Sequence, residues 1–142
     1  MKKFFATALI LLMLALSTAN CFAATSSSNS EMSPQYVVTM LHVETFTISS
    51  GGMASMKGRL EPMDDTEVDQ VKITLTLEDG AGTVVYNKTY DATWSNVSKS
   101  YSTTKNYQLG KAGRYTFRAT YKCYKNGSLL ETIKCDPLYK SF

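Results

Sequence analysis

The sequence is poor in the residues that usually build catalytic and metal sites. It has one histidine, His42, and three cysteines among 142 residues. A single histidine excludes sites that need several imidazoles, and it requires other good ligands to hold zinc. A Ser-His-acid triad is formally open, but no Gly-x-Ser-x-Gly elbow accompanies it. We therefore interpret His42 as an ordinary strand residue and predict that the protein is not an enzyme.

Cofactor motifs and strong net charge are also missing. No Gly-rich loop follows a strand and opens a helix, so the sequence offers no phosphate cradle of that kind. The net charge of +3 is too small to suggest nucleic acid as a partner. Residues 61–69 hold five carboxylates, which leaves weak calcium binding open, but the central Gly and closing Glu of an EF-hand are absent. We interpret 61–69 as a solvated loop and expect no cofactor and no metal.

A long hydrophobic run occurs only near the N-terminus. Two lysines precede an apolar run over 4–16, and small residues then offer cleavage after Ala23 or Ala24. This pattern predicts a cleaved secretory signal peptide over 1–24 and a secreted, extracellular protein with no membrane contact after cleavage. The alternative, a retained transmembrane helix, would need roughly 18 or more unbroken apolar residues.

Cys21 raises a second alternative, a lipoprotein anchor. A lipobox has an aliphatic residue three positions before the cysteine and a small residue directly before it. Thr18 and Asn20 occupy those positions, so lipidation is disfavoured. We expect residues 25–34 to form a flexible Ser-rich leader and residues 35–142 to form one domain.

Charge is distributed unevenly along this part of the chain. Residues 25–97 contain ten acidic and four basic residues, a net charge of −6, whereas residues 98–142 contain two acidic and nine basic residues, a net charge of +7. Such an asymmetry bears on partners rather than on fold.

Apolar residues alternate with polar ones over most of residues 36–135, which predicts strands with one buried face. The clearest case is 69–78, where Val71, Ile73, Leu75 and Leu77 share one face. Further strands are predicted over 36–48, 53–60, 83–90 and 97–109, the last one exposed, and 113–135 forms a hairpin that reverses at Asn126-Gly127. About seven strands at this spacing predict an all-β fold, an antiparallel β-sandwich.

Leu109-Gly-Lys-Ala-Gly-Arg-Tyr115-Thr-Phe117 resembles the tyrosine corner of immunoglobulin-like sandwiches. The resemblance implies an Ig-like architecture in which Tyr115 anchors the corner and Phe117 stands where antibody domains carry a cysteine. Trp94 comes too late in the chain to be the usual core tryptophan, so a true antibody domain is not implied.

A second resemblance covers nearly all of residues 25–142. The segment 46–58, the strand 71–77, the ribbon Gly113-Arg-Tyr-Thr-Phe-Arg-Ala119 and the return 127–132 are similar to segments of small secreted proteins of Gram-positive, clostridial-type bacteria. The resemblance implies secretion from a Gram-positive bacterium and an Ig-like sandwich. It implies no activity and no catalytic residue.

Cys123 and Cys135 suggest a disulfide if the protein is exported. With a two-residue turn at Asn126-Gly127, however, Cys123 would lie opposite Leu130 and Cys135 opposite Arg118, about 16 Å apart along the ladder. A disulfide needs Cα atoms within about 7 Å. We therefore predict free thiols, and no base nearby suggests a nucleophilic cysteine.

The outward face of the 113–135 ribbon is basic. Arg114, Arg118 and Lys122 recur every four residues and Tyr124 continues the row. A solvated outer sheet face would show the same pattern. The functional interpretation is a binding surface for anionic glycans, wall polymers or a surface protein, because arginine grips carboxylate and phosphate. The alternative is a structural protein that self-associates through strand edges, with residues 97–108 as the free edge; an exported hydrolase ranks third.

Overall fold

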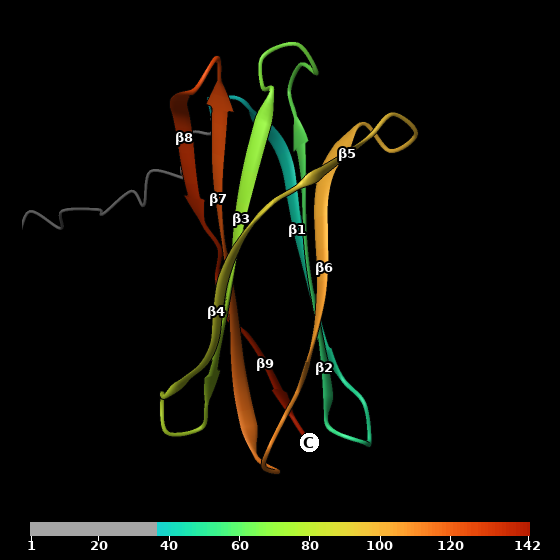
Figure 1. The fold of residues 1–142 in the computed structure, drawn as a ribbon, viewed down its shortest axis with the longest axis vertical. Helices are drawn as coiled ribbons and strands as arrows, with labels where there is room; N and C mark the ends of the chain where they lie inside the picture. Colours follow the sequence, from blue (N-terminus) through green and yellow to red (C-terminus); the bar gives the residue numbers. More distant parts are fainter. Residues whose placement is uncertain (1–36) are drawn as a thin grey trace, which may run out of the picture. The chain divides into compact units, whose positions relative to one another are not determined.

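The computed structural model describes residues 37–142, which form an antiparallel β-sandwich (Figure 1). Residues 37–142 belong to one compact unit. The predicted signal peptide over 1–24 and the predicted leader over 25–34 lie outside the described residues. Residues 37–142 contain no helix that is long and apolar enough to cross a membrane.

Nine strands follow one another along the described part of the chain. They are β1 (Thr39–Ile48), β2 (Met53–Pro62), β3 (Gln70–Asp79), β4 (Val84–Asp91), β5 (Thr93–Ser95), β6 (Ser100–Gln108), β7 (Arg114–Lys125), β8 (Ser128–Lys134) and β9 (Leu138–Ser141). One sheet has the order β1-β2-β6-β5, and the other has the order β4-β3-β7-β8, with β9 also paired to β7. All the pairings are antiparallel.

This strand order confirms the Ig-like sandwich. An Ig domain has strands A, B, E and D in one sheet and C, F and G in the other, with C′ added beside C in some domains. Here β1, β2, β6 and β5 take the places of A, B, E and D, while β4, β3, β7 and β8 take those of C′, C, F and G. The sequence predicted about seven strands because β5 and β9 have only three and four residues and show no alternation.

The core lies between the two sheets and follows from the alternation. Val71, Ile73, Leu75 and Leu77 of β3 are fully buried, as predicted. On β7 the buried residues are Tyr115, Phe117, Ala119, Tyr121 and Cys123. Phe46 of β1 meets Phe117 across the sandwich, with ring centroids 5.4 Å apart. Burial of these side chains between the sheets stabilises the fold through the hydrophobic effect.

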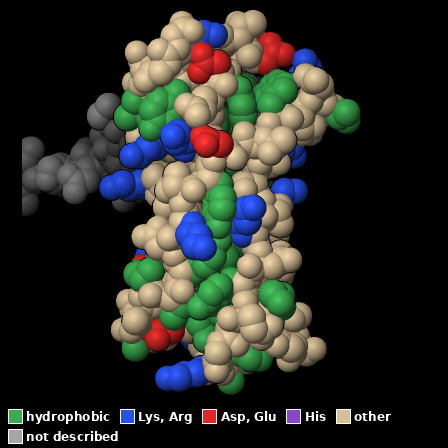
Figure 2. All heavy atoms as spheres, in the orientation of Figure 1, with side chains coloured by type: hydrophobic (Ala, Val, Ile, Leu, Met, Phe, Trp, Pro, Cys, Tyr) green, Lys and Arg blue, Asp and Glu red, His purple; other side chains and the backbone are tan. Residues whose placement is uncertain are grey.

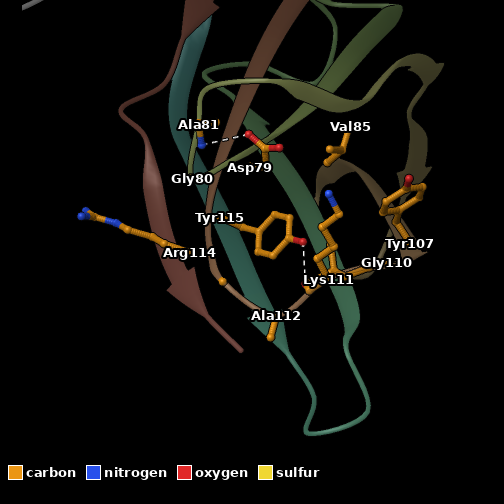
Figure 3. A pocket seen from close by; sticks show the side chains of 12 residues that line it. Asp79, Gly80, Ala81, Val85, Tyr107, Gly110, Lys111, Ala112, Arg114 and Tyr115 are labelled. Atoms are coloured by element: carbon orange, nitrogen blue, oxygen red, sulfur yellow. Dashed lines mark hydrogen bonds between the residues drawn. The ribbon is translucent and has the colours of Figure 1, made fainter.

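The tyrosine corner is confirmed. The Tyr115 hydroxyl donates to the carbonyl oxygen of Lys111 over 2.7 Å, which ties the start of β7 to the preceding turn (Figure 3). A Tyr hydroxyl bonded to the backbone a few residues upstream, at the entry to strand F, is the defining feature of this corner.

The β7–β8 hairpin differs from the prediction by one residue. Asn126 and Gly127 adopt φ values of 50° and 77°, which fits the predicted two-residue turn. Cys123, however, pairs with Glu131 and Tyr124 with Leu129, so Leu130 is an extra, unpaired residue. Cys135 therefore bonds to Ala119, through its N–H and the Ala119 carbonyl at 3.0 Å, and not to Arg118.

The predicted exposed strand over 97–109 is β6, but it is not a free edge at its start. It pairs with β2 along Tyr101–Gln108 and with β5 along Ser100–Ser102. Tyr101 is buried, and its hydroxyl donates to the Val68 carbonyl over 2.9 Å. The self-association interface predicted for 97–108 is therefore partly covered by β5.

Candidate functional site

The outer face of the β4-β3-β7-β8 sheet carries all four residues that the sequence singled out. Arg114, Arg118, Lys122 and Tyr124 alternate along β7 with its buried residues, so they share the side that faces solvent. Figure 2 shows Lys and Arg side chains gathered where β7 and β8 run. The structure thus brings these side chains onto one surface, although their surroundings differ.

Two of these four side chains, Arg118 and Arg114, already interact with neighbouring residues. Arg118 Nη1 lies 2.6 Å from Glu78 Oε2 on the neighbouring strand β3. Arg114 stacks on Tyr139 of β9, with its guanidinium carbon 4.5 Å from the ring centroid. Exposed pairs of this kind contribute little stability, but both fix the arginine side chain against the sheet.

The remaining charge gathers around Lys122. Lys72 of β3 lies directly opposite Lys122 in the register of the two strands. Lys134 of β8 lies opposite Thr120, which is the outward-facing residue of β7 next to Lys122. Lys72 Nζ lies 6.0 Å from the Tyr124 ring centroid and 3.9 Å from Asp91 Oδ1. Within residues 37–142 Lys122 has no ion pair and no hydrogen bond to its side chain, so its charge faces solvent.

We call Lys72, Lys122, Lys134 and Tyr124 the lysine cluster. Sequence reasoning missed Lys72 and Lys134 because they come from other strands. Lys72 stands at a polar position of the alternating strand 69–78, so its outward direction was readable from the sequence. Its place beside Lys122 depends on the β3–β7 register, which only the tertiary structure sets.

The acidic loop between β2 and β3 is held by separate local contacts. Asp64 accepts hydrogen bonds from the backbone N–H and the hydroxyl of Thr66, and these bonds lower the pKa of its carboxyl. Asp65 lies 2.9 Å from Lys99, and Asp69 accepts from the backbone N–H of Asn126 over 2.7 Å. The carboxylates are therefore spread over different partners and do not converge on one point.

A cavity of about 410 Å³ lies beside the tyrosine corner (Figure 3). Its walls come from the β3–β4 turn and the β6–β7 turn. Asp79 in its wall accepts from the backbone N–H groups of Ala81 and Thr83, at 3.0 and 2.9 Å, so its carboxylate serves the turn. Figure 3 shows Arg114 pointing away from this cavity. The cavity size suits a small ligand, but its charged groups do not converge on a ligand position.

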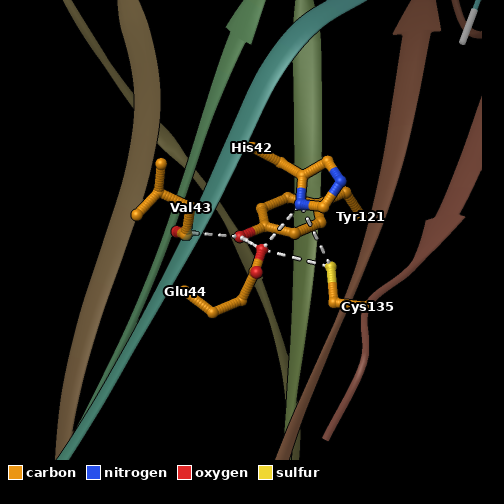
Figure 4. A network of polar contacts seen from close by, with 5 residues as sticks. All are labelled: His42, Val43, Glu44, Tyr121 and Cys135. Carbon is orange, nitrogen blue, oxygen red and sulfur yellow. Dashed lines mark hydrogen bonds and ion pairs between the residues drawn. The ribbon is translucent and has the colours of Figure 1, made fainter. Parts of the chain in front are cut away.

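A polar cluster, which we call the thiol cluster, lies on the inner side of β1 (Figure 4). Glu44 Oε1 lies 3.1 Å from His42 Nδ1, 3.1 Å from Cys135 Sγ and 2.7 Å from the Tyr121 hydroxyl. Cys135 Sγ is also 3.6 Å from His42 Nδ1. Burial raises the pKa of Tyr121 and of Cys135, and in both the neighbouring Glu44 raises it further.

Sequence reasoning missed the thiol cluster. It placed Cys135 on the outer face opposite Arg118, and the bulge at Leu130 moves it to the inner face. One signal was present, since His42 and Glu44 are two apart and so share one side of a strand.

Both described cysteines, Cys123 and Cys135, are free thiols, as predicted. The two thiols are too far apart for a disulfide because Cys135 bonds to Ala119 of β7, which lies four residues away from Cys123 on the same strand. Burial raises the pKa of Cys123, and a hydrogen bond with Thr39 partly offsets this, so that the pKa is about 11. A buried thiol of this kind is inert as a nucleophile at neutral pH.

Comparison with known proteins adds no functional assignment. The sequence matches no protein-family model and no curated protein. A search of solved structures matches the chain with the crystal structure of hypothetical protein PH1083 from Pyrococcus horikoshii OT3, with a TM-score of 0.41 and 10% sequence identity. That match covers 70% of this chain and 90% of the other chain, and neither the fold nor the function is inferred from it.

Proposed function

We propose that this protein is a secreted, non-enzymatic binding module that holds anionic glycans or wall polymers against the outer face of the β4-β3-β7-β8 sheet. The proposal rests on Lys72 and Lys122, two like charges placed directly opposite each other in the β3–β7 register. Directly opposed like charges destabilise a sheet. Lys72 already forms an ion pair with Asp91 at 3.9 Å, and a bound phosphate or carboxylate between the two ammonium groups would add a partner for Lys122.

The surroundings of the two lysines support a polymer ligand. Lys134 extends the positive charge onto β8 and Arg114 extends it along β7, whereas the charge of Arg118 is paired with Glu78. Tyr124 is half-buried beside Lys72, and its aromatic ring would contact a sugar of the ligand. Lys72, Lys122 and Lys134 lie outside the cavity beside the tyrosine corner and on the open face of the sheet, which suits a repeating anionic chain better than a small molecule. Such a chain would be held by charge and would be sensitive to salt.

The test is cosedimentation of the purified protein with teichoic-acid-bearing Gram-positive cell walls at low and high salt. We expect binding at low salt that falls steeply at high salt. The triple variant Lys72→Glu, Lys122→Glu, Lys134→Glu should lose binding at both salt concentrations while keeping the parent circular dichroism spectrum. Arg118→Gln should reduce binding less, because Glu78 already neutralises that side chain.

The matched control reverses three exposed lysines elsewhere, Lys57, Lys111 and Lys140. It changes the net charge by the same amount, so it separates a local site from a general charge effect. Equal loss in both triple variants, or no loss in the first, would contradict the proposal. Binding that persists on walls stripped of teichoic acid would assign the ligand to another wall component.

A second candidate function is self-association along β1. Within residues 37–142 this strand pairs only with β2, and it exposes apolar side chains, among them Met40, Leu41 and Val43, which are 63%, 46% and 41% exposed. An exposed apolar edge strand is a template for pairing with another chain. Sedimentation velocity should then show a dimer that Val43→Lys disrupts; a monomer at high concentration would remove this candidate.

A further inference from the structure

The thiol cluster places three different metal-ligating groups around one point. His42 and Glu44 extend from the inner side of β1, and Cys135 extends from the segment that joins β8 to β9 (Figure 4). Their ligand atoms all lie within 4.8 Å of one another. We propose that His42, Glu44 and Cys135 form a three-residue site for Zn²⁺, which is independent of the binding surface on the outer sheet face.

The distances between the three ligand atoms suit one face of a tetrahedron. Zinc binds nitrogen and oxygen at about 2.0 to 2.2 Å and sulfur at about 2.3 Å. At tetrahedral angles these bond lengths place pairs of ligand atoms about 3.3 to 3.6 Å apart. The observed separations are 3.1 Å for His42 to Glu44, 3.1 Å for Cys135 to Glu44 and 3.6 Å for Cys135 to His42. An ion can therefore enter with side-chain shifts of a few tenths of an ångström.

The mixture of ligands favours zinc over the hard cations. Thiolate and imidazole suit zinc and other late first-row metals, whereas calcium and magnesium take oxygen ligands. Three protein ligands leave the fourth tetrahedral position for water or another group. The side chains of His42 and Glu44 are 21% and 14% exposed, so the site is within reach of solvent. The thiol proton of Cys135 leaves to solvent as the metal binds.

Tyr121 would position the carboxylate ligand. Its hydroxyl donates to Glu44 Oε1 over 2.7 Å, and the residue is fully buried on β7. Hydrogen bonds to metal-binding groups fix their orientation, and removing one typically lowers metal affinity about 10- to 100-fold. Gly58 lies against the same hydroxyl, since a Cβ there would come within 2.9 Å of it. The bare backbone of β2 thus leaves room for Tyr121 to reach Glu44.

The test is a titration with Co²⁺, which replaces Zn²⁺ and is visible by absorption. The Cys21→Ser protein keeps only the two described thiols, and we expect it to bind one Co²⁺ with a thiolate-to-cobalt charge-transfer band. Zn²⁺ should remove the band and raise the melting temperature. Cys135→Ser should abolish the band, and Tyr121→Phe should weaken binding about 10- to 100-fold.

The matched control is Cys123→Ser, which removes the other buried thiol and should leave the band unchanged. If Cys135→Ser does not fold, His42→Gln tests the same triangle, because it should keep the sulfur band but lower the affinity. Absence of a charge-transfer band in the Cys21→Ser protein would overturn the proposal. A band that survives in Cys135→Ser and disappears in Cys123→Ser would overturn it equally.

Discussion

At the scale of single residues, Gly58 has the clearest steric role. It lies on the inner side of β2, where an added Cβ would come within 2.9 Å of the Tyr121 hydroxyl and 3.0 Å of Ile73 Cγ2. Both neighbours are fully buried, so neither can move into solvent. Glycine is therefore required here by a close approach between the two sheets, not by an unusual φ angle.

We predict that Gly58→Ala destabilises the fold by about 1 to 3 kcal/mol, the range for overpacking a core. Urea unfolding measures the change. Gly110→Ala is the control, because a Cβ there would meet nothing within 4 Å, and it should leave stability nearly unchanged. Equal stability of the two variants would show that the contact between β2 and β7 relaxes without cost.

At the scale of elements, the bulge at Leu130 decides which face of β8 is buried. A hairpin without the bulge would place Ile133 opposite Thr120 and Cys135 opposite Arg118, on the outer face. The extra residue shifts the register by one, so that Ile133 lies opposite Tyr121 and is buried. A one-residue slip exchanges the two faces of a strand, and burial of Ile133 favours the bulged register. The same shift carries Cys135 toward His42 and Glu44.

Deleting Leu130 should therefore remove the bulge without changing the register beyond it. Glu131 then follows Leu129 directly and still lies opposite Cys123, so Ile133 stays buried opposite Tyr121. We expect both the deletion and Leu130→Ala to change the free energy of unfolding by no more than about 0.5 kcal/mol, because Leu130 is exposed. Urea unfolding measures both changes. A loss of about 1.5 to 3 kcal/mol on deletion, the range for exposing Ile133, would contradict this register.

At the scale of the whole molecule, tyrosines close the open side between the two sheets. β4 belongs to one sheet and continues through Ala92 into β5 of the other (Figure 1). Tyr86 of β4 packs on Tyr107 of β6 with ring centroids 5.3 Å apart, and Lys105 Nζ lies 4.6 Å from the Tyr90 centroid. Figure 2 shows the resulting apolar strip, flanked by basic side chains, between β4 and β6.

This closure makes stability sensitive to alkaline pH. Burial, together with a hydrogen bond to the Tyr90 hydroxyl, raises the pKa of Tyr86 to about 12, above the value near 10 of an unfolded tyrosine. The stability that neutral Tyr86 contributes is thus fully present below about pH 10 and is lost as pH rises through 12. Urea unfolding from pH 8 to 12 should show the parent protein losing stability faster than Tyr86→Phe. Parallel pH profiles would contradict this assignment.

The sequence by itself determined what depends on local alternation. Period-two patterns predicted β3 and β7 together with their buried faces. Asn126-Gly127 predicted a turn, and the segment from Leu109 to Tyr115 predicted the tyrosine corner. These features depend on backbone preferences and on the sorting of apolar from polar side chains, which neighbouring residues show directly. The outward row of Arg114, Arg118 and Lys122 follows from the same rule.

Only the tertiary structure decided what depends on register between distant strands. In the folded protein Lys72 lies opposite Lys122, and Arg118 pairs with Glu78. Cys135 contacts His42 and Glu44. Each of these contacts changes if one strand slips by a single residue, and the slip at Leu130 was settled by burial of Ile133 in a core shared by both sheets. The alternation of one strand carries no information about which residue of another strand will stand opposite it.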